Sequence, residues 1–232
     1  MNYRVLFVGN SGTHVNDMPK IFEHIAQSVG IDCLCEKEAP DSMRLVQHSD
    51  PQEECGKELI NKLAEFRPTI VFFQENGNVL LGTDGRYPQE NARIKCAAAA
   101  KKLVEMARQV GAKPYFYIRT AYEYEKKGAD RKLQGRIFRD FFGILGALLN
   151  VPCADVSRAF DLCIEECPTI DPYGPDRAHH SKAGSYLVAC TCFAKVFGTD
   201  FETVSPWELD PDTAATLWNI ARRAAKSEIL EK

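Results

Sequence analysis

The sequence lacks several features that would place a protein in a class at once. No apolar run in its 232 residues approaches the ~18 residues that a membrane span needs. The N-terminus has no basic segment, long apolar segment or small-residue cleavage site, so we do not expect its first residues to be a secretory signal. The net charge is only −3 and there is no long Lys/Arg run. We therefore expect a cytoplasmic protein that binds neither membrane nor nucleic acid, although a signal already removed from a precursor would leave no trace here.

The cysteine pattern also excludes common classes. The nine cysteines are an odd number, and most lie in apolar patterns, which is typical of reduced thiols in a core. The close pairs lack the two-pair spacing of a zinc module; they are Cys33 and Cys35, Cys163 and Cys167, and Cys190 and Cys192. We expect no metal and no cofactor.

What the sequence does contain is an alternation of two periodicities. Apolar, β-rich runs predict strands at 3–8, 31–35, 69–73, 114–118 and 151–156. Helical spacing predicts helices at 17–29, 52–66, 89–110, 131–149, 157–167 and 181–197. Such alternation predicts an α/β fold, a three-layer αβα sandwich with an approximately five-stranded, parallel, flavodoxin-like sheet.

The same pattern indicates how the chain is organised. No repeat of fixed period and no linker occurs, so a single domain over 1–232 is expected. Within it, 206–232 would add a C-terminal helix, with Asp210 as its N-cap and Pro211 at its first position. Long irregular loops are expected at 36–51, 79–88 and 119–130.

Polar loops follow three of the predicted strands, at 9–13, 74–78 and 171–180. Ligands of open α/β sheets bind at the carboxyl ends of the strands, where these loops would meet. The first loop carries Ser11 on a glycine-rich turn, and the last places Asp176 three residues before His179. A serine needs a base within ~3 Å to act as a nucleophile, and a carboxylate can orient that base. The alternatives are a turn or capping role for Ser11 and a purely local hydrogen bond for His179.

These blocks resemble the SGNH (GDSL-like) hydrolases, over the chain up to about residue 198. Gly9-Asn10-Ser11 matches a bacterial branch that has Gly-Asn-Ser in place of Gly-Asp-Ser, and its last block is similar to the segment from Asp176 to Leu187. The resemblance implies a serine esterase acting on a carbohydrate or small-molecule ester, removing acetyl or other short acyl groups. It assigns Ser11 as nucleophile, His179 as base and Asp176 as its orienter, with His180 as the rival base.

The third block looks closer to the Gln-Gly-Glu-Ser/Asn block of carbohydrate acetylesterases. That likeness implies that Gln74, and second Asn76, supplies an oxyanion-hole donor. Tyr87, Tyr122 and Tyr124 are candidates for stacking on a sugar ring.

The second block departs from the family, because no glycine occurs between residues 39 and 49 to supply the usual oxyanion-hole N–H. A degenerate member that binds a glycan without cleaving it therefore remains an alternative, as does a phosphate-binding flavodoxin-like module built on residues 10–13. The sequence leaves the oligomeric state open.

Overall fold

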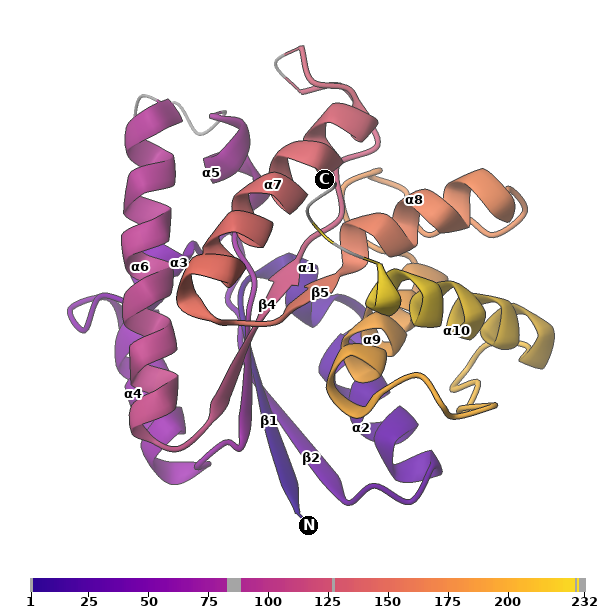
Figure 1. The fold of residues 1–232 in the computed structure, drawn as a ribbon, viewed down its shortest axis with the longest axis horizontal. Coiled ribbons are helices and arrows are strands. Elements are labelled where there is room, and N and C mark those ends of the chain that lie inside the picture. The colour runs from indigo at the N-terminus through magenta and orange to yellow at the C-terminus, as the bar shows by residue number, and fades with distance from the viewer. Residues whose placement is uncertain (1, 83–88, 127, 228, 230–232) are drawn as a thin grey trace.

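A single parallel sheet forms the middle of the structure, a computed structural model that describes residues 2–82, 89–126, 128–227 and 229. Its strands are β1 (Tyr3–Val8), β2 (Cys33–Glu38), β3 (Ile70–Phe73), β4 (Lys113–Ile118) and β5 (Cys153–Asp155). They lie in the order β2-β1-β3-β4-β5, and every neighbouring pair is parallel. All carboxyl ends therefore reach the same edge, the upper one in Figure 1.

Helices connect the strands and cover both faces of the sheet. They are α1 (Ser11–His14), the 3-10 turn η1 (Val15–Asp17), α2 (Met18–Ser28), α3 (Leu45–His48), α4 (Glu54–Glu65), α5 (Gly77–Leu81), α6 (Gln89–Gln109), α7 (Arg131–Leu149), α8 (Val156–Glu166), α9 (Lys182–Phe197) and α10 (Pro211–Lys226).

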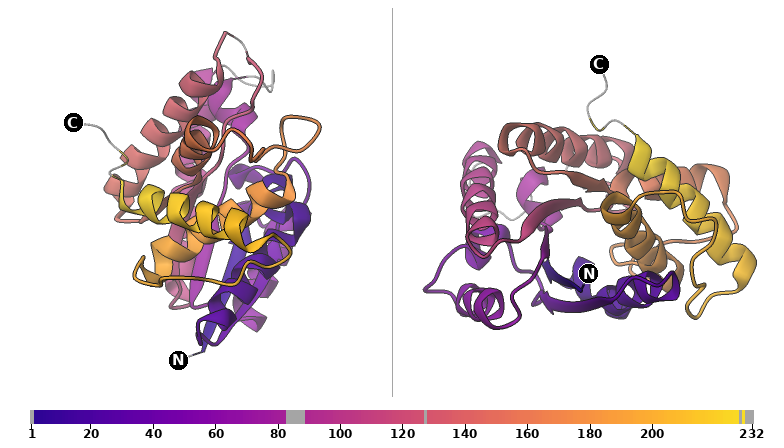
Figure 2. Two further views of the ribbon diagram at one scale, coloured as in Figure 1. Left: turned by 90° about the vertical axis from the view of Figure 1, so that its right-hand side faces the viewer. Right: turned by 60° about the horizontal axis from the view of Figure 1, so that its bottom comes forward.

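Alternate side chains along the strands divide the core into two halves. Val5 and Phe7 point to one face, where they pack with α2, α8, α9 and α10. Leu6 and Val8 point to the other, where they pack with α3 to α7. The turned view in Figure 2 shows helices on both sides of the sheet. This arrangement confirms the predicted αβα sandwich with a five-stranded parallel sheet.

The C-terminal helix is shorter than 206–232 but lies on the core. It begins after Asp210, whose side chain accepts a hydrogen bond from Thr213 N–H, and Pro211 is its first residue. Leu217 and Trp218 are fully buried against the helices of the first face, and the Trp218 indole donates to Phe201 O at 3.0 Å.

The short elements differ from the sequence prediction. β2 continues to Glu38, and α1, α3 and α5 lie in segments predicted to be loops, because elements this short carry too few residues to show a period. Residues 83–88, with Tyr87, lie outside the described residues. All nine cysteines are free thiols, and eight are buried, as the apolar patterns predicted. No helix of the described residues is long and apolar enough to cross a membrane.

Candidate active site

Ser11 is held on a rigid turn where β1 ends. Asn10 is the N-cap of α1, and its Oδ1 accepts a hydrogen bond from Gly12 N–H at 3.1 Å. A Cβ at Gly9 would lie 2.4 Å from Thr13 Oγ1 and 2.6 Å from a side-chain oxygen behind the turn, so only glycine fits there. The turn therefore fixes Ser11 as the first residue of α1, half-buried at the carboxyl edge of the sheet.

Asp176 and His179 form a compact turn in the loop before α9. Asp176 Oδ1 accepts hydrogen bonds from the N–H groups of Ala178 at 3.0 Å and His179 at 2.9 Å. Its Oδ2 lies 2.5 Å from His179 Nδ1. The backbone N–H and ring of His179 stabilise the ionised form, so they hold the pKa of Asp176 well below its usual value.

The fold brings these two loops together. His179 Nε2 lies 2.9 Å from Ser11 Oγ. An ionised carboxylate only accepts hydrogen bonds, so His179 Nδ1 must donate to Asp176, which leaves Nε2 to accept the hydrogen of the Ser11 hydroxyl. The side chains of His179 and Asp176 are 42% and 51% exposed, so a ligand can reach this hydrogen-bonded chain from solvent.

His180 does not compete for the same position. Its ring lies 5.2 Å from the Phe160 ring and is buried, and burial lowers its pKa to about 3. Its carbonyl oxygen accepts a hydrogen bond from Asn16 Nδ2 at 3.0 Å. His179, not His180, is therefore the histidine that contacts Ser11.

Gln74 lies beneath the turn that carries Ser11. Its Oε1 accepts hydrogen bonds from Asn10 N–H at 3.2 Å and from the Thr13 hydroxyl at 2.9 Å. Its Nε2 donates to the Glu75 carbonyl, and the residue is 1% exposed. Gln74 thus supports the turn from below, and its burial beneath that turn disfavours the expected oxyanion role.

Asn76 is the more accessible of the two expected donors. It is the N-cap of α5 through its Oδ1, which accepts from Asn78 N–H at 3.0 Å. Its Nδ2 donates one hydrogen to Ser42 O at 3.1 Å, and the described residues offer the second hydrogen no acceptor. We therefore reverse the order of the two candidates and place Asn76 before Gln74.

The second block, which lacks a glycine, is tied to the site by side chains. Asn10 Nδ2 donates to Met43 O at 3.0 Å, and Ser42 has a left-handed φ of 63°. The Glu75 carboxylate accepts from Leu45 N–H at 3.3 Å and from Asn76 N–H at 2.6 Å. Glu75 is buried, and burial raises its pKa to about 7.

Two of the tyrosines proposed to stack on a sugar ring contact each other, and only one of the two is exposed to solvent. The rings of Tyr122 and Tyr124 stack at 5.5 Å, with Tyr122 buried and Tyr124 41% exposed. Sequence reasoning missed the residue beside them, Arg119, which is buried and donates to the Tyr122 hydroxyl at 2.7 Å. Its position directly after the apolar strand run 114–118 was the available signal, since a charge there reaches the ligand-binding edge.

Comparisons with known proteins show the fold. No protein-family model matches the chain, and no curated protein matches it in sequence. A candidate SGNH hydrolase from Slackia heliotrinireducens is 24% identical, with a TM-score of 0.63 over 82% of this chain and 96% of that one. A DUF4886 family protein from Bacteroides uniformis is 16% identical, with a TM-score of 0.75 over 97% and 95%.

A mutant acetyl-xylooligosaccharide esterase from Geobacillus is also 16% identical, with a TM-score of 0.61 over 88% of this chain and 96% of that one. At such identities the likeness is one of architecture. The chain has the α/β fold, with a five-stranded parallel sheet between helices, that SGNH hydrolase structures have.

Proposed function

We propose that the protein is a serine ester hydrolase that removes acetyl or other short acyl groups from a carbohydrate or a small ester. The observation that carries this proposal is the continuous chain of hydrogen-bond distances from Asp176 through His179 to Ser11, at 2.5 Å and 2.9 Å. The architecture it shares with esterases adds support, since two of those structures are described as an acetyl xylan esterase and an acetyl-xylooligosaccharide esterase.

The proposed reaction has two halves, the acylation of Ser11 and the hydrolysis of the acyl-Ser11 ester. Ser11 Oγ attacks the ester carbonyl carbon while His179 Nε2 takes its proton, and Asp176 stabilises the imidazolium. The tetrahedral intermediate collapses, His179 returns the proton to the departing alkoxide, and an acyl-Ser11 ester remains. Water then attacks the carbonyl carbon of that ester while His179 Nε2 takes its proton. The bond between the acyl carbon and Ser11 Oγ breaks, His179 passes the proton to Oγ, and the carboxylic acid leaves.

Two N–H groups are suited to hold the negative oxygen of the intermediate. The Ser11 N–H has no acceptor within its helix, because Ser11 is the first residue of α1. The second hydrogen of Asn76 Nδ2 is the other donor. Removing one such donor typically lowers kcat by ~10²–10³. Asn76→Ala is therefore expected to lower kcat by this factor while the protein remains folded.

The first experiment is hydrolysis of 4-nitrophenyl acetate by the wild type, Ser11→Ala and His179→Ala, with folding followed by circular dichroism. Both variants are expected to lose more than ~10³-fold in kcat. The chain supplies a matched control, since His24 Nε2 lies 2.7 Å from Ser205 Oγ in a second Ser–His contact. Ser205→Ala should keep wild-type turnover. Wild-type turnover in folded Ser11→Ala would contradict the proposal.

A further inference from the structure

A buried cation lies at the carboxyl edge of the sheet without a carboxylate partner. Arg119 follows β4 directly and is 7% exposed. It donates one side-chain hydrogen bond, from Nη1 to the Tyr122 hydroxyl at 2.7 Å, and its guanidinium carbon lies 4.3 Å from the centre of that ring. Its Nε–H is buried with no acceptor, and no carboxylate of the described residues pairs with it.

Such a group is expensive for the folded protein. Removing an ion from water carries a large free-energy cost even after relaxation, and a cation–π contact with an aromatic ring returns only part of that cost. A buried N–H without an acceptor adds a further penalty. The packing of the described residues around Arg119 therefore leaves its charge without a counter-ion and its Nε–H without an acceptor, which is the state expected of a site that an anion completes.

A second cation flanks the same aromatic ring. Lys126 Nζ lies 3.8 Å from the centre of the Tyr122 ring and donates to Asn78 Oδ1 at 2.6 Å. Its partners among the described residues are neutral. The neighbouring Arg177 is different, because Glu123 and Asp171 both pair with it. Within this part of the chain, the positive charges of Arg119 and Lys126 are thus left without a carboxylate, whereas the charge of Arg177 is balanced by two.

These cations belong to the same edge of the sheet as the proposed triad. The loop after β4 contacts the loop that carries Asp176 and His179, because Glu123 N–H donates to Arg177 O at 3.1 Å and Thr120 Oγ1 lies 3.0 Å from the Tyr173 hydroxyl. The positive charge of Arg119 is also one of the causes that lower the pKa of His180.

We propose that Arg119, together with Lys126, binds a carboxylate of the ester substrate, so that the preferred substrates are acidic esters. The planar guanidinium suits a carboxylate, and charge-assisted hydrogen bonds of this kind are strong in a desolvated setting. The inference rests on the proposed ester hydrolysis. The carboxylate belongs either to the acyl half or to the alcohol half of the ester, and the test separates the two.

Two pairs of substrates differ by one carboxylate. For the acyl half, 4-nitrophenyl hydrogen adipate is compared with 4-nitrophenyl hexanoate. For the alcohol half, O-acetylated galacturonate is compared with O-acetylated galactose, with acetate release as the readout. In one pair, the wild type should show a kcat/KM for the acidic member that exceeds the neutral one by on the order of tenfold or more.

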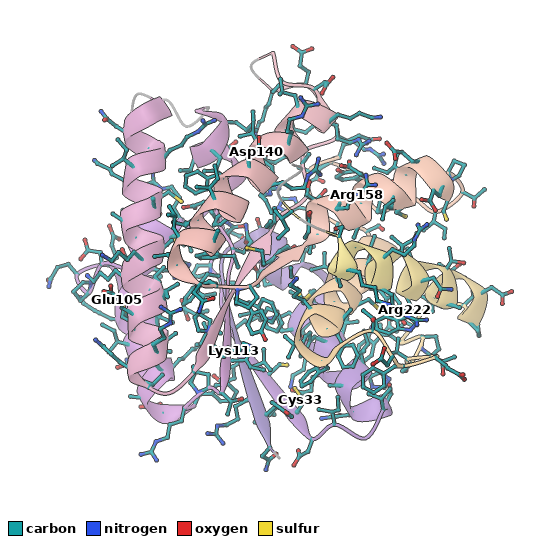
Figure 3. The ribbon with its side chains drawn as sticks, in the orientation of Figure 1. Cys33, Glu105, Lys113, Asp140, Arg158 and Arg222 are labelled. Carbon is teal, nitrogen blue, oxygen red and sulfur yellow. The ribbon has the colours of Figure 1, made fainter. Side chains whose placement is uncertain are left out.

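Substitutions identify the origin of that preference. The ratio of acidic to neutral kcat/KM should fall toward one in Arg119→Gln. It should fall partly in Arg119→Lys, which keeps the charge but loses the planar, forked set of N–H donors. It should also fall in Lys126→Gln. The control is Lys113→Gln. Lys113 lies at the opposite end of β4 (Figure 3), with its Nζ 5.1 Å from the Tyr115 ring, so the same charge is lost away from the site and the wild-type ratio should remain.

A binding measurement without turnover makes the outcome independent of catalysis. Sodium adipate and sodium galacturonate are added to Ser11→Ala, and Tm is followed. One of them should raise Tm in Ser11→Ala and not in Ser11→Ala with Arg119→Gln. Equal kcat/KM within both substrate pairs, or a preference that survives in Arg119→Gln, would overturn the inference. Absence of any Ser11-dependent turnover, with the Tm shift retained, would instead overturn the proposed hydrolysis and leave the anion site standing.

Discussion

At the scale of single residues, the amide of Asn10 makes two hydrogen bonds, of which a carboxylate could make only one. Its Oδ1 accepts from Gly12 N–H, which an aspartate could do equally well. Its Nδ2 donates to Met43 O at 3.0 Å, which an aspartate cannot do. The amide therefore caps α1 and holds the second block with the same side chain.

This dual use predicts a cost for Asn10→Asp. The substitution leaves the Met43 carbonyl without its donor and faces it with a buried carboxylate, since Asn10 is 4% exposed. The free energy of unfolding should fall by about 1–3 kcal/mol, measured by urea denaturation. Asn150→Asp is the control, because Asn150 is an exposed helix C-cap and should change stability by only a few tenths of a kcal/mol. Equal stability of wild type and Asn10→Asp would contradict this account.

Glu75 gives the protein a pH dependence of defined sign. Burial raises its pKa to about 7, above the ordinary value of 4.5. Between these values the folded chain keeps a proton that the unfolded chain has released, so the contribution of Glu75 to the free energy of unfolding falls as pH rises through this window and levels off above 7. The contribution is on the order of 3 kcal/mol.

Glu75→Gln is expected to flatten this dependence, because glutamine resembles the protonated carboxyl. The Tm of the wild type relative to that of the variant should fall as pH rises from 5 to 7. Burial also raises the pKa of Asp155 to about 6 and lowers that of His180 to about 3, and these two contributions of opposite sign are common to both proteins. Parallel curves across the whole range would remove Glu75 as the cause.

At the scale of elements, the first turn of α9 sets the position of the Asp176–His179 turn. Ser181 caps this helix by accepting from Gly184 N–H at 3.1 Å. A Cβ at Gly184 would lie 1.9 Å from Pro172 O, so helix and loop touch through bare backbone. The loop is thus held against the end of α9, which explains how an exposed segment keeps His179 within reach of Ser11.

Gly184→Ala should therefore displace the loop and lower both Tm and kcat on 4-nitrophenyl acetate, the latter by on the order of tenfold or more, since small misplacements of reacting groups are costly. Gly56→Ala is a matched control, because its Cβ would also lie 1.9 Å from a backbone oxygen, that of Asp50. It should lower Tm while the activity of the folded fraction remains. Comparable loss of activity in both variants would show a general effect of destabilisation.

The order of the elements could be predicted from the sequence because long helices and buried strands have a clear period. Short elements could not: α3 and α5 have four and five residues, which is too few to show one. β2 ends in Glu36-Lys37-Glu38, a charged segment at the edge of the sheet whose pattern is that of a loop. The loops of the site were found because strand ends are well marked.

At the scale of the whole molecule, topology is what made the candidate site predictable. Parallel strands bring loops distant in sequence to one edge, so the juxtaposition of Ser11 and His179 follows from the order of the elements. The direction of a side chain does not follow in this way. Gln74 points beneath the turn and Arg119 lies buried beside Tyr122, and both placements depend on how side chains from distant segments pack.

The C-terminal helix belongs to the core of the molecule, and the two tryptophans of the chain test this directly. Trp218 on α10 is 1% exposed and packs 5.9 Å from the Phe193 ring of α9. Trp207 is 36% exposed and contacts the His24 ring at its edge, at 4.7 Å. Trp218→Ala should lower the free energy of unfolding by about 3–5 kcal/mol, because it empties a large core volume.

Trp207→Ala should cost less than ~1 kcal/mol. Each variant also retains a single tryptophan, so its fluorescence reports one site. In Trp207→Ala, the remaining emission from Trp218 should be blue-shifted and should move to the red together with the loss of circular dichroism on unfolding. A change in Trp218 emission at lower urea than the main transition would show that α10 detaches before the sheet unfolds. We expect a single transition instead, because α10 covers α8 and α9 and shares their core cluster.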